Sequence, residues 1–202
     1  MLGTGAPSNP FSTANVRPGA VRWVGGDSVA MVAARLEAAG AGQIVGAHGT
    51  GKSTLLAHLV RHLRASGREV LVTRDGKVQP RPGVIVALDG GESMPRASLR
   101  ALARRAASRA SVVGSGIVAT AHCDLGLPTI ARTSVDVAIA RAVVREVLAR
   151  WPSLSPPPDD DLAASLSRHG GDLRLVLFEL YDRHERRASP LTVTSTILDS
   201  SK

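Results

Sequence analysis

The most informative segment of the chain reads Gly46-Ala47-His48-Gly49-Thr50-Gly51-Lys52-Ser53-Thr54. Residues 46–53 follow the pattern G-x-x-x-x-G-K-S. The glycines allow a tight turn in which successive backbone N–H groups point inward at a chain of phosphates. The lysine supplies a positive charge for the β- and γ-phosphates, and the serine hydroxyl is a ligand for Mg²⁺. The segment therefore predicts a nucleoside triphosphate site, with Gly46 through Thr54 as its phosphate-binding loop.

The residues on both sides of this loop agree with the pattern. A loop of this kind lies between a strand and a helix, whose N-terminal dipole attracts an anion. Gln43-Ile44-Val45 is a short apolar run that enters the loop. Beyond the loop, apolar residues recur at helical spacing until Gly67, at Leu55, Leu56, Leu59, Val60 and Leu63. We therefore expect a strand that ends at the loop and a helix that begins in it.

Composition narrows the class of protein. The chain has 202 residues, of which 44% are hydrophobic, and a formal net charge of +8. This length is enough for one α/β domain with a small appendage. The sequence has no apolar run long enough to cross a membrane and no apolar signal segment near its start, and its one cysteine, Cys123, cannot form an internal disulfide. We therefore expect a cytoplasmic protein with no membrane partner.

The rest of the sequence predicts alternating strands and helices. Apolar runs indicate strands over residues 69–73, 84–88, 116–122 and, more weakly, 128–133. Helical periodicity indicates helices over about 29–40, 96–110, 135–150 (with Ser134 as its cap), 159–168 and 172–187. This alternation favours an α/β fold with a mostly parallel sheet. Together with the phosphate-binding loop, we expect a P-loop NTPase three-layer sandwich, to which the resemblance described below adds a small C-terminal helical lid.

Changes in composition suggest four parts. They are a flexible leader (1–20), a nucleotide-binding domain (21–152), a small helical lid (153–188) and a flexible tail (189–202). One link is unusually short, because residues 74–83 supply only ten positions between strands expected to be parallel. Parallel strands usually need a dozen or more connecting residues. The crossover is therefore bare, or the strand at 69–73 is misplaced or antiparallel.

Two carboxylates follow the apolar run at 84–88. Asp89 ends a strand that reads as fully buried, which is the Walker B pattern, and its carboxylate can hold Mg²⁺ opposite Ser53. Glu92 lies three residues further on and can orient or deprotonate the attacking water. Its other interpretation is a carboxylate at the start of the next helix. The usual catalytic glutamate directly follows the aspartate, and here Gly90 takes that position.

Thr120 and His122 end the strand at 116–122. If this strand lies between the Walker A and Walker B strands, the chain resembles the additional-strand class of P-loop ATPases, which includes the AAA-type machines. In that class a polar side chain at this strand end senses the γ-phosphate. The resemblance implies Thr120 as this sensor and His122 as the second choice. His48, inside the loop, is at a variable position and receives no catalytic role.

The C-terminal stretch strengthens the resemblance. Gly171-Asp172-Leu173-Arg174 looks like the start of the lid helix of AAA-type ATPases, which implies that Arg174 reaches the bound nucleotide. The other interpretation is a capped amphipathic helix with a surface arginine. The chain is also similar to short uncharacterised bacterial P-loop proteins, through Gly46–Leu56, Asp89–Glu92, Thr120–His122 and Phe178–Asp182.

Three functions remain open from the sequence. The first is Mg²⁺-dependent ATP binding and hydrolysis coupled to a conformational change, with Lys52, Glu92, Thr120 and Arg174 as catalytic residues and Ser53 and Asp89 as metal ligands. The second is a small-molecule or nucleotide kinase, because Gly67 through Gly76 resembles the opening of thymidylate-type kinases. The third is a nucleotide-dependent nucleic-acid-binding module, suggested by the arginines at 96, 100, 104, 105 and 109. A homo-oligomer or a protein partner also remains open.

Overall fold

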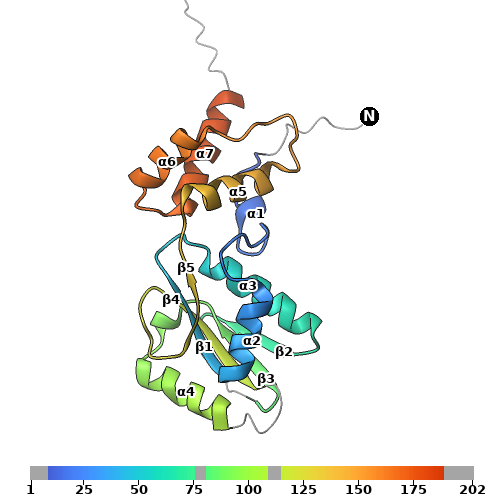
Figure 1. Cartoon of the computed structure of the whole chain (residues 1–202), viewed down its shortest axis with the longest axis vertical. Helices are drawn as coiled ribbons and strands as arrows, with labels where there is room; N and C mark the ends of the chain where they lie inside the picture. The colour runs from blue at the N-terminus through green and yellow to red at the C-terminus, as the bar shows by residue number, and fades with distance from the viewer. Residues whose placement is uncertain (1–8, 76–80, 109–114, 189–202) are drawn as a thin grey trace, which may run out of the picture.

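The computed structural model describes residues 9–75, 81–108 and 115–188. A five-stranded parallel sheet lies at its centre, in the order β2-β3-β4-β1-β5 (Figure 1). The strands are β1 (Ala41–Gly46), β2 (Glu69–Thr73), β3 (Val84–Leu88), β4 (Gly116–Ala121) and β5 (Thr129–Thr133). The predicted α/β class is confirmed. β4 lies between β1 and β3, which is the order that the resemblance to additional-strand ATPases requires.

Helices cover both faces of the sheet. Successive residues of a strand point to opposite faces, so Ile85 and Ala87 of β3 pack with α2 (Val29–Ala39) and α3 (Lys52–Ala65). Val86 and Leu88 point the other way, toward α4 (Arg96–Ser108). A short 3-10 turn, η1 (Gly91–Ser93), joins β3 to α4. This arrangement is the predicted three-layer sandwich, and it leaves the carboxyl ends of the strands free to form a site.

The short link between β2 and β3 joins two parallel neighbours. Their register runs from Glu69 opposite Val84 to Thr73 opposite Leu88. The alternatives of a misplaced or antiparallel strand are therefore excluded. Residues 76–80 of this link lie outside the described residues, as do residues 109 and 110 at the end of the helix expected over 96–110.

A second layer of helices lies beyond the carboxyl end of the sheet (Figure 1). It consists of α5 (Val137–Leu148), α6 (Asp159–Arg168) and α7 (Leu173–Ala188), whose apolar faces share one cluster. We call these three helices the lid. The lid therefore includes α5, which the sequence analysis assigned to the nucleotide-binding domain. Helix α5 begins at Val137 because Asp136, not Ser134, caps it by accepting a hydrogen bond from the Ile139 N–H at 2.7 Å.

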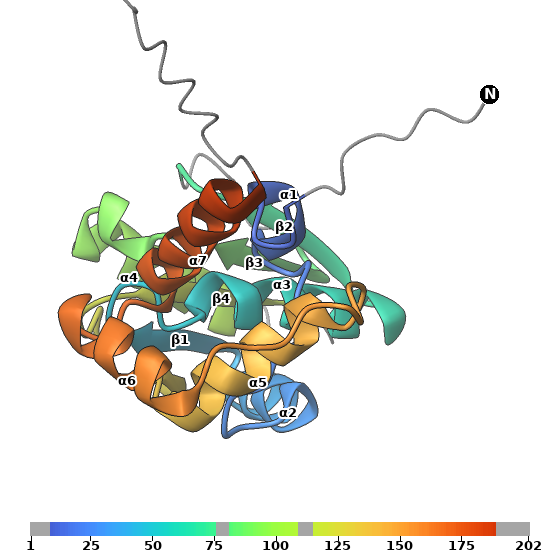
Figure 2. The same ribbon diagram turned by 90° about the horizontal axis from the view of Figure 1, so that it is seen from above.

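The segment 9–27, which we call the strap, ties the lid to the sheet. It contains the one-turn helix α1 (Thr13–Val16), whose Val16 packs against the lid cluster, and Figure 2 shows the strap and the lid from above. The Asn9 amide donates to the Tyr181 carbonyl at 3.0 Å, and Phe11 is buried in the lid cluster. Arg61 of α3 donates to the Gly19 carbonyl at 2.6 Å.

The strap differs from the leader expected over 1–20, because residues 9–20 are packed against the lid and α3. Phe11 and Val21 supply the buried apolar side chains that hold it there. Residues 1–8 of the expected leader and the whole expected tail, 189–202, lie outside the described residues. In the part of the chain that the structure describes, no helix is long and apolar enough to span a bilayer.

Candidate functional site

The phosphate-binding loop joins the end of β1 to the start of α3, as predicted. Gly49 and Gly51 have φ values of +66° and +91°, in the left-handed region that favours glycine. The buried Thr50 hydroxyl donates to the Ala47 carbonyl at 2.8 Å and lies 2.7 Å from Thr133 Oγ1. The loop is thus fixed to the end of β5, with the first turn of α3 directly behind it.

Lys52 is buried against this loop rather than extended into solvent. Its Nζ donates to the carbonyls of Gly46 and Ala47 at 2.7 and 2.6 Å, and lies 3.0 Å from His122 Nδ1. Burial lowers the pKa of Lys52, while the negative charge of Glu92 opposes that shift. The ammonium group is therefore held by three uncharged acceptors, which an anionic ligand can replace.

A chain of hydrogen bonds connects the start of α3 with the ends of β3 and β4, through Ser53, Asp89 and Thr120. The Ser53 hydroxyl donates to Asp89 Oδ1 at 2.7 Å, and the Thr120 hydroxyl donates to the same oxygen at 2.9 Å. Thr120 Oγ1 in turn accepts from the Gly90 N–H at 2.8 Å. Thr120 is buried, and these bonds use its hydroxyl to hold the Asp89 carboxylate beside Ser53.

His122 contacts three functional groups from three different elements. Its backbone N–H donates to Glu92 Oε1 on η1, and its ring faces Lys52 of α3. The ring also packs on that of His48 in the loop, with centroids 3.6 Å apart and planes inclined by 30°. Partial desolvation lowers the pKa of His122, and the charges of Lys52 and His48 lower it further. His122 and not Thr120 is therefore the strand-end side chain next to the lysine.

The lid reaches the loop through the start of α7. Asp172 Oδ1 accepts from the N–H groups of Arg174 and Leu175 at 2.9 and 3.3 Å, which caps the helix. The same carboxylate packs directly against Gly49: a Cβ added there would overlap Asp172 Oδ1 and lie 2.9 Å from its Cα. The positively charged Arg174 is close enough to Lys52 to lower its pKa.

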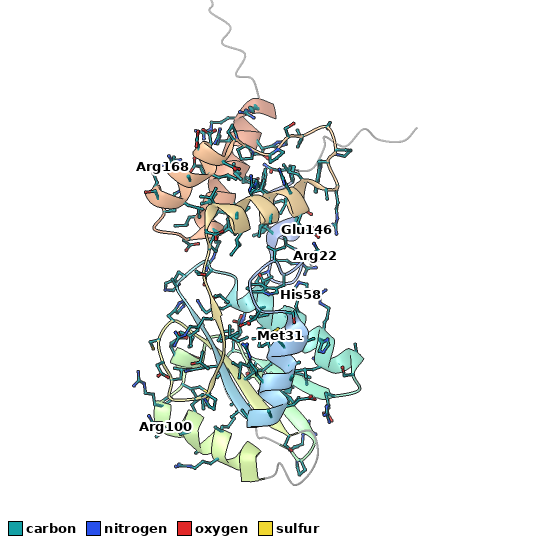
Figure 3. The ribbon with its side chains drawn as sticks, in the orientation of Figure 1. Arg22, Met31, His58, Arg100, Glu146 and Arg168 are labelled. Carbon is teal, nitrogen blue, oxygen red and sulfur yellow. The ribbon has the colours of Figure 1, made fainter. Side chains whose placement is uncertain are left out.

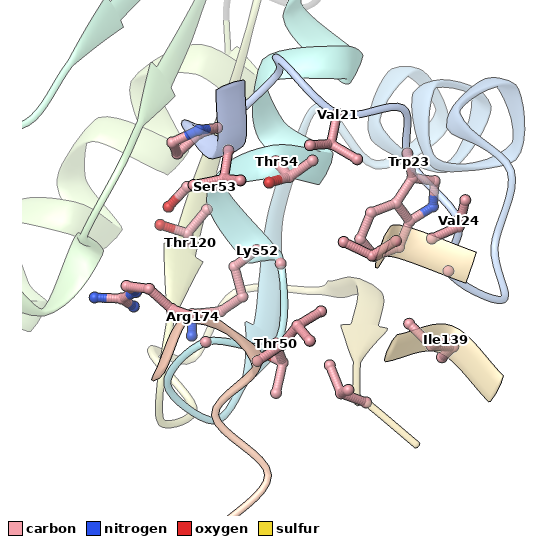
Figure 4. A pocket seen from close by; sticks show the side chains of 18 of the residues that line it. Val21, Trp23, Val24, Thr50, Lys52, Ser53, Thr54, Thr120, Ile139 and Arg174 are labelled. Carbon is pink, nitrogen blue, oxygen red and sulfur yellow. The ribbon is translucent and has the colours of Figure 1, made fainter. Parts of the chain in front are cut away.

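A pocket of about 490 Å³ lies between the loop, the strap and the lid (Figure 4). One side is polar and contains the predicted Lys52, Ser53, Thr54, Asp89, Glu92, Thr120 and Arg174. The other side is largely apolar and is formed by the strap and the helices α5 and α7, through Val16, Val21, Trp23, Val24, Val135, Ile139, Val143 and Leu177. Of the predicted loop residues, Gly46, Ala47 and His48 do not line this pocket.

The apolar side of the pocket was missed by the sequence analysis. Trp23 packs beside Gly51, and its indole N–H donates to the Asp27 carbonyl at 2.9 Å. Arg22 links the strap to α5 through Glu146, 4.0 Å away (Figure 3). Arg74, which follows β2, also lines the pocket, and its Nε lies 3.9 Å from Asp89 Oδ2. A tryptophan among turn-forming residues, in a chain with 2% aromatic residues, was the signal that could have revealed this wall.

The comparisons with known proteins agree with this geometry. The family model described as AAA domain matches residues 7–176, and the chain therefore belongs to that family, whose members are nucleotide-binding proteins of the P-loop ATPase type. Domain III of the replication initiation protein DnaA from Thermotoga maritima is similar in structure, with 16% identity, 80% of this chain and 83% of that chain covered, and a TM-score of 0.52. This likeness supports the fold alone.

Two further solved structures are more distant. The replication initiator DnaA bound to AMPPCP and single-stranded DNA shares 15% identity, with 88% of this chain and 68% of that chain covered and a TM-score of 0.48. NtrX from Brucella abortus shares 13% identity, with 86% of this chain and 52% of that chain covered and a TM-score of 0.44. The search of curated proteins finds no match.

Proposed function

We propose that this protein binds ATP together with Mg²⁺, hydrolyses it, and moves its lid during the cycle. One observation carries the proposal. The lysine and serine of the loop, the carboxylates Asp89 and Glu92, and Arg174 of the lid line one pocket, although they come from three separate segments of the chain. The AAA domain match over residues 7–176 supports the same class of activity.

The two sides of the pocket suit the two parts of a nucleotide. The loop amides and Lys52 would hold the phosphates on the polar side. The apolar side, with Trp23, Ile139 and Leu177, suits a nucleotide base that is held by packing against apolar and aromatic side chains. Figure 4 shows Trp23 and Ile139 on this side of the pocket. Among the described residues that line this apolar side there is no carboxylate of the kind that reads a guanine base. This favours ATP over GTP.

The residues around Ser53 fit Mg²⁺. Ser53 Oγ and Asp89 Oδ1 are hard oxygen donors already 2.7 Å apart. Among the described residues no group of three or more His, Cys, Asp or Glu forms a metal cluster. A pair of protein oxygens is enough, because Mg²⁺ usually takes one or two protein ligands together with phosphates and water. When bound, the ion would supply positive charge to the phosphate oxygens.

The polar side chains then have distinct roles. Glu92 would place or deprotonate the attacking water, once it leaves the His122 N–H. Thr120 keeps Asp89 oriented. His122, as the strand-end side chain next to Lys52, is assigned the contact with the γ-phosphate in place of Thr120. Arg174 would neutralise charge that develops on the transferred phosphoryl group.

The experiment measures nucleotide binding and phosphate release with Mg²⁺ and no acceptor. We expect Lys52→Ala to lose binding, and Glu92→Gln to bind ATP but to slow turnover by about a hundredfold or more. Glu69→Gln on β2 is the matched control, because Glu69 is exposed and does not line the pocket. Full turnover in Glu92→Gln would move the water-activating role elsewhere. Phosphate release that requires an added acceptor would instead make the protein a kinase.

A second candidate function is binding to nucleic acid, and helix α4 favours it. Arg96, Arg100 and Arg104 recur every four residues, so they share one side of the helix, and all three are exposed. Figure 3 labels Arg100 on this helix. None of them is in a salt bridge within the described residues, and α4 contains no acidic residue. Such a stripe suits the phosphates of DNA or RNA.

The salt dependence of binding tests this second function. Three phosphate contacts predict a slope of log K against log salt of roughly −2.7 on duplex DNA. Replacing the three α4 arginines by glutamine should remove most of that slope. A matched variant with the same change of charge, in Arg145, Arg186 and Arg187, should keep it. Equal loss in both variants would show that the net charge, and not α4, causes the binding.

A further inference from the structure

Two histidines at the site have no role in the proposed hydrolysis beyond a single phosphate contact. His48 lies in the phosphate-binding loop and His122 follows β4, yet their rings are stacked at 3.6 Å. Both side chains are solvent-exposed, so apolar burial does not explain why the two rings meet. The His122 ring lies beside Lys52, and the charge of this lysine determines the protonation of the ring.

The contact with Lys52 fixes the state of the His122 ring. An ammonium group can only donate hydrogen bonds, so Nδ1, at 3.0 Å from Lys52 Nζ, must present its lone pair. The ring is then neutral, with its proton on Nε2. The charges of Lys52 and His48 both act against a second proton on this ring, and Glu92 and the Gly46 carbonyl act in its favour.

A bound triphosphate would reverse this balance. Lys52 of such a loop contacts the β- and γ-phosphates, so it would exchange the Gly46 and Ala47 carbonyls and His122 Nδ1 for phosphate oxygens. His122 would lose the neighbouring cation that is hydrogen-bonded to its Nδ1, and it would gain the γ-phosphate, which a diphosphate lacks, as a nearby anion. Both changes favour the doubly protonated ring, which can donate from both nitrogens. The other charged groups around Lys52 are Asp89 after β3 and Asp172 and Arg174 of the lid.

We propose that His122, held in place by the ring of His48, takes up a proton when a nucleoside triphosphate binds, and that the diphosphate does not cause this uptake. His122 is the proton acceptor and His48 is a positioning residue. The inference rests on the proposed nucleotide binding. It means that the site distinguishes ATP from ADP partly through a proton, with tighter binding of the triphosphate as the pH falls through the histidine range.

The test is calorimetric titration with a non-hydrolysable ATP analogue and Mg²⁺ at pH 7, in buffers of different ionisation enthalpy. We expect the wild type to take up protons when it binds the ATP analogue and to take up none when it binds ADP. His122→Asn should abolish the uptake, because an amide can accept from Lys52 and donate to phosphate but cannot titrate. His62→Asn on α3 is the matched control, since His62 is exposed and outside the pocket. The phosphate group has its own pKa near 6, but its titration is common to all variants and cancels.

The affinity for the analogue supplies a second readout. Between pH 8 and pH 6 we expect it to rise about tenfold more in the wild type than in His122→Asn, because only the wild-type side chain can gain a proton when the analogue binds. His48→Ala should weaken analogue binding about threefold, and His48→Phe should restore it by keeping a ring against His122. The chain has six histidines, so imidazole proton resonances can follow His122 directly in the wild type.

Several results would overturn the inference. Equal proton uptake in the wild type and His122→Asn would show that His122 does not bind the proton. Equal uptake with ADP and the ATP analogue would show that the γ-phosphate does not cause the uptake. His48→Phe that behaves like His48→Ala would remove the positioning role. If the wild type binds the analogue without proton uptake, only this inference fails, whereas a wild type that binds no nucleotide overturns the proposed function as well.

Discussion

Replacing Gly49 by alanine is expected to push the lid away from the phosphate-binding loop. Gly49 has a φ of +66°, and a Cβ at this position would overlap Asp172 Oδ1 and lie 2.9 Å from the Asp172 Cα. A backbone atom cannot move aside like the tip of a long side chain, so the first turn of α7 would have to shift. Gly67→Ala is the matched control, because Gly67 has a φ of +79° and nothing lies within 4 Å of an added Cβ.

Both substitutions lose stability because alanine must adopt a left-handed backbone, and Gly49→Ala loses more because its added Cβ overlaps the lid. A left-handed alanine costs about 1 kcal/mol at either position. At Gly49 the overlap adds about 1–2 kcal/mol, and the loss of the Asp172 cap adds about 1 kcal/mol. We therefore expect the free energy of unfolding to fall by about 3–4 kcal/mol in Gly49→Ala and about 1 kcal/mol in Gly67→Ala.

Urea unfolding followed by circular dichroism measures both values. A double-mutant cycle with Asp172→Ala then isolates the contact, because that change removes the two atoms that overlap the added Cβ most closely. The cycle should give a coupling of about 1 kcal/mol or more. If Gly49→Ala and Gly67→Ala cost the same, or if the cycle shows no coupling, then the lid does not rest on the loop as we describe.

Three more changes have clear expectations. Trp23→Ala removes much of the apolar wall of the pocket, so the affinity for an ATP analogue should fall about tenfold by titration calorimetry, and unchanged affinity would exclude the wall as a base site. Phe11→Ala leaves a cavity in the lid cluster and should cost about 3 kcal/mol in urea unfolding. The hydrogen bond from the Ser165 hydroxyl lowers the pKa of Glu179 from its usual 4.5. The ionised Glu179 therefore stabilises the fold above pH 4.5. This stabilisation is lost as the pH falls through the lowered pKa of the folded protein. Ser165→Ala should therefore reduce stability at pH 7 and move acid unfolding to higher pH, which a pH titration of ellipticity would detect.

The sheet was predictable because each of its strands carries a local signal. β3 is an unbroken apolar run ending at Asp89, and β1 enters a glycine-rich loop, so both could be assigned without knowledge of their neighbours. Local signals also located α6, which has the predicted bounds of Asp159–Arg168. The strand order was not predictable in this way, because no local pattern says which strands are neighbours, and the resemblance only states the order that it requires.

The walls and contacts of the site were less predictable, because they depend on segments distant in sequence. Trp23 belongs to the pocket only because the strap crosses to the lid. Helix α5 joins the lid cluster through an apolar face that would serve equally well against a sheet. Thr120 and His122 are both polar residues at one strand end, and only the side-chain geometry shows which of them faces Asp89 and which faces Lys52.

The strap also has a consequence for how the protein is made. The Asn9 amide and the Tyr181 carbonyl, which bond to each other, are 172 residues apart in the sequence. Synthesis proceeds from the N-terminus, so the strap leaves the ribosome before its partners on α7. Contacts between such distant residues form late, since they must overcome the entropy of closing a long loop. We therefore expect a nascent chain that ends before α7 to hold a folded sheet and an unfinished pocket, with nucleotide binding gained only when α7 has been released.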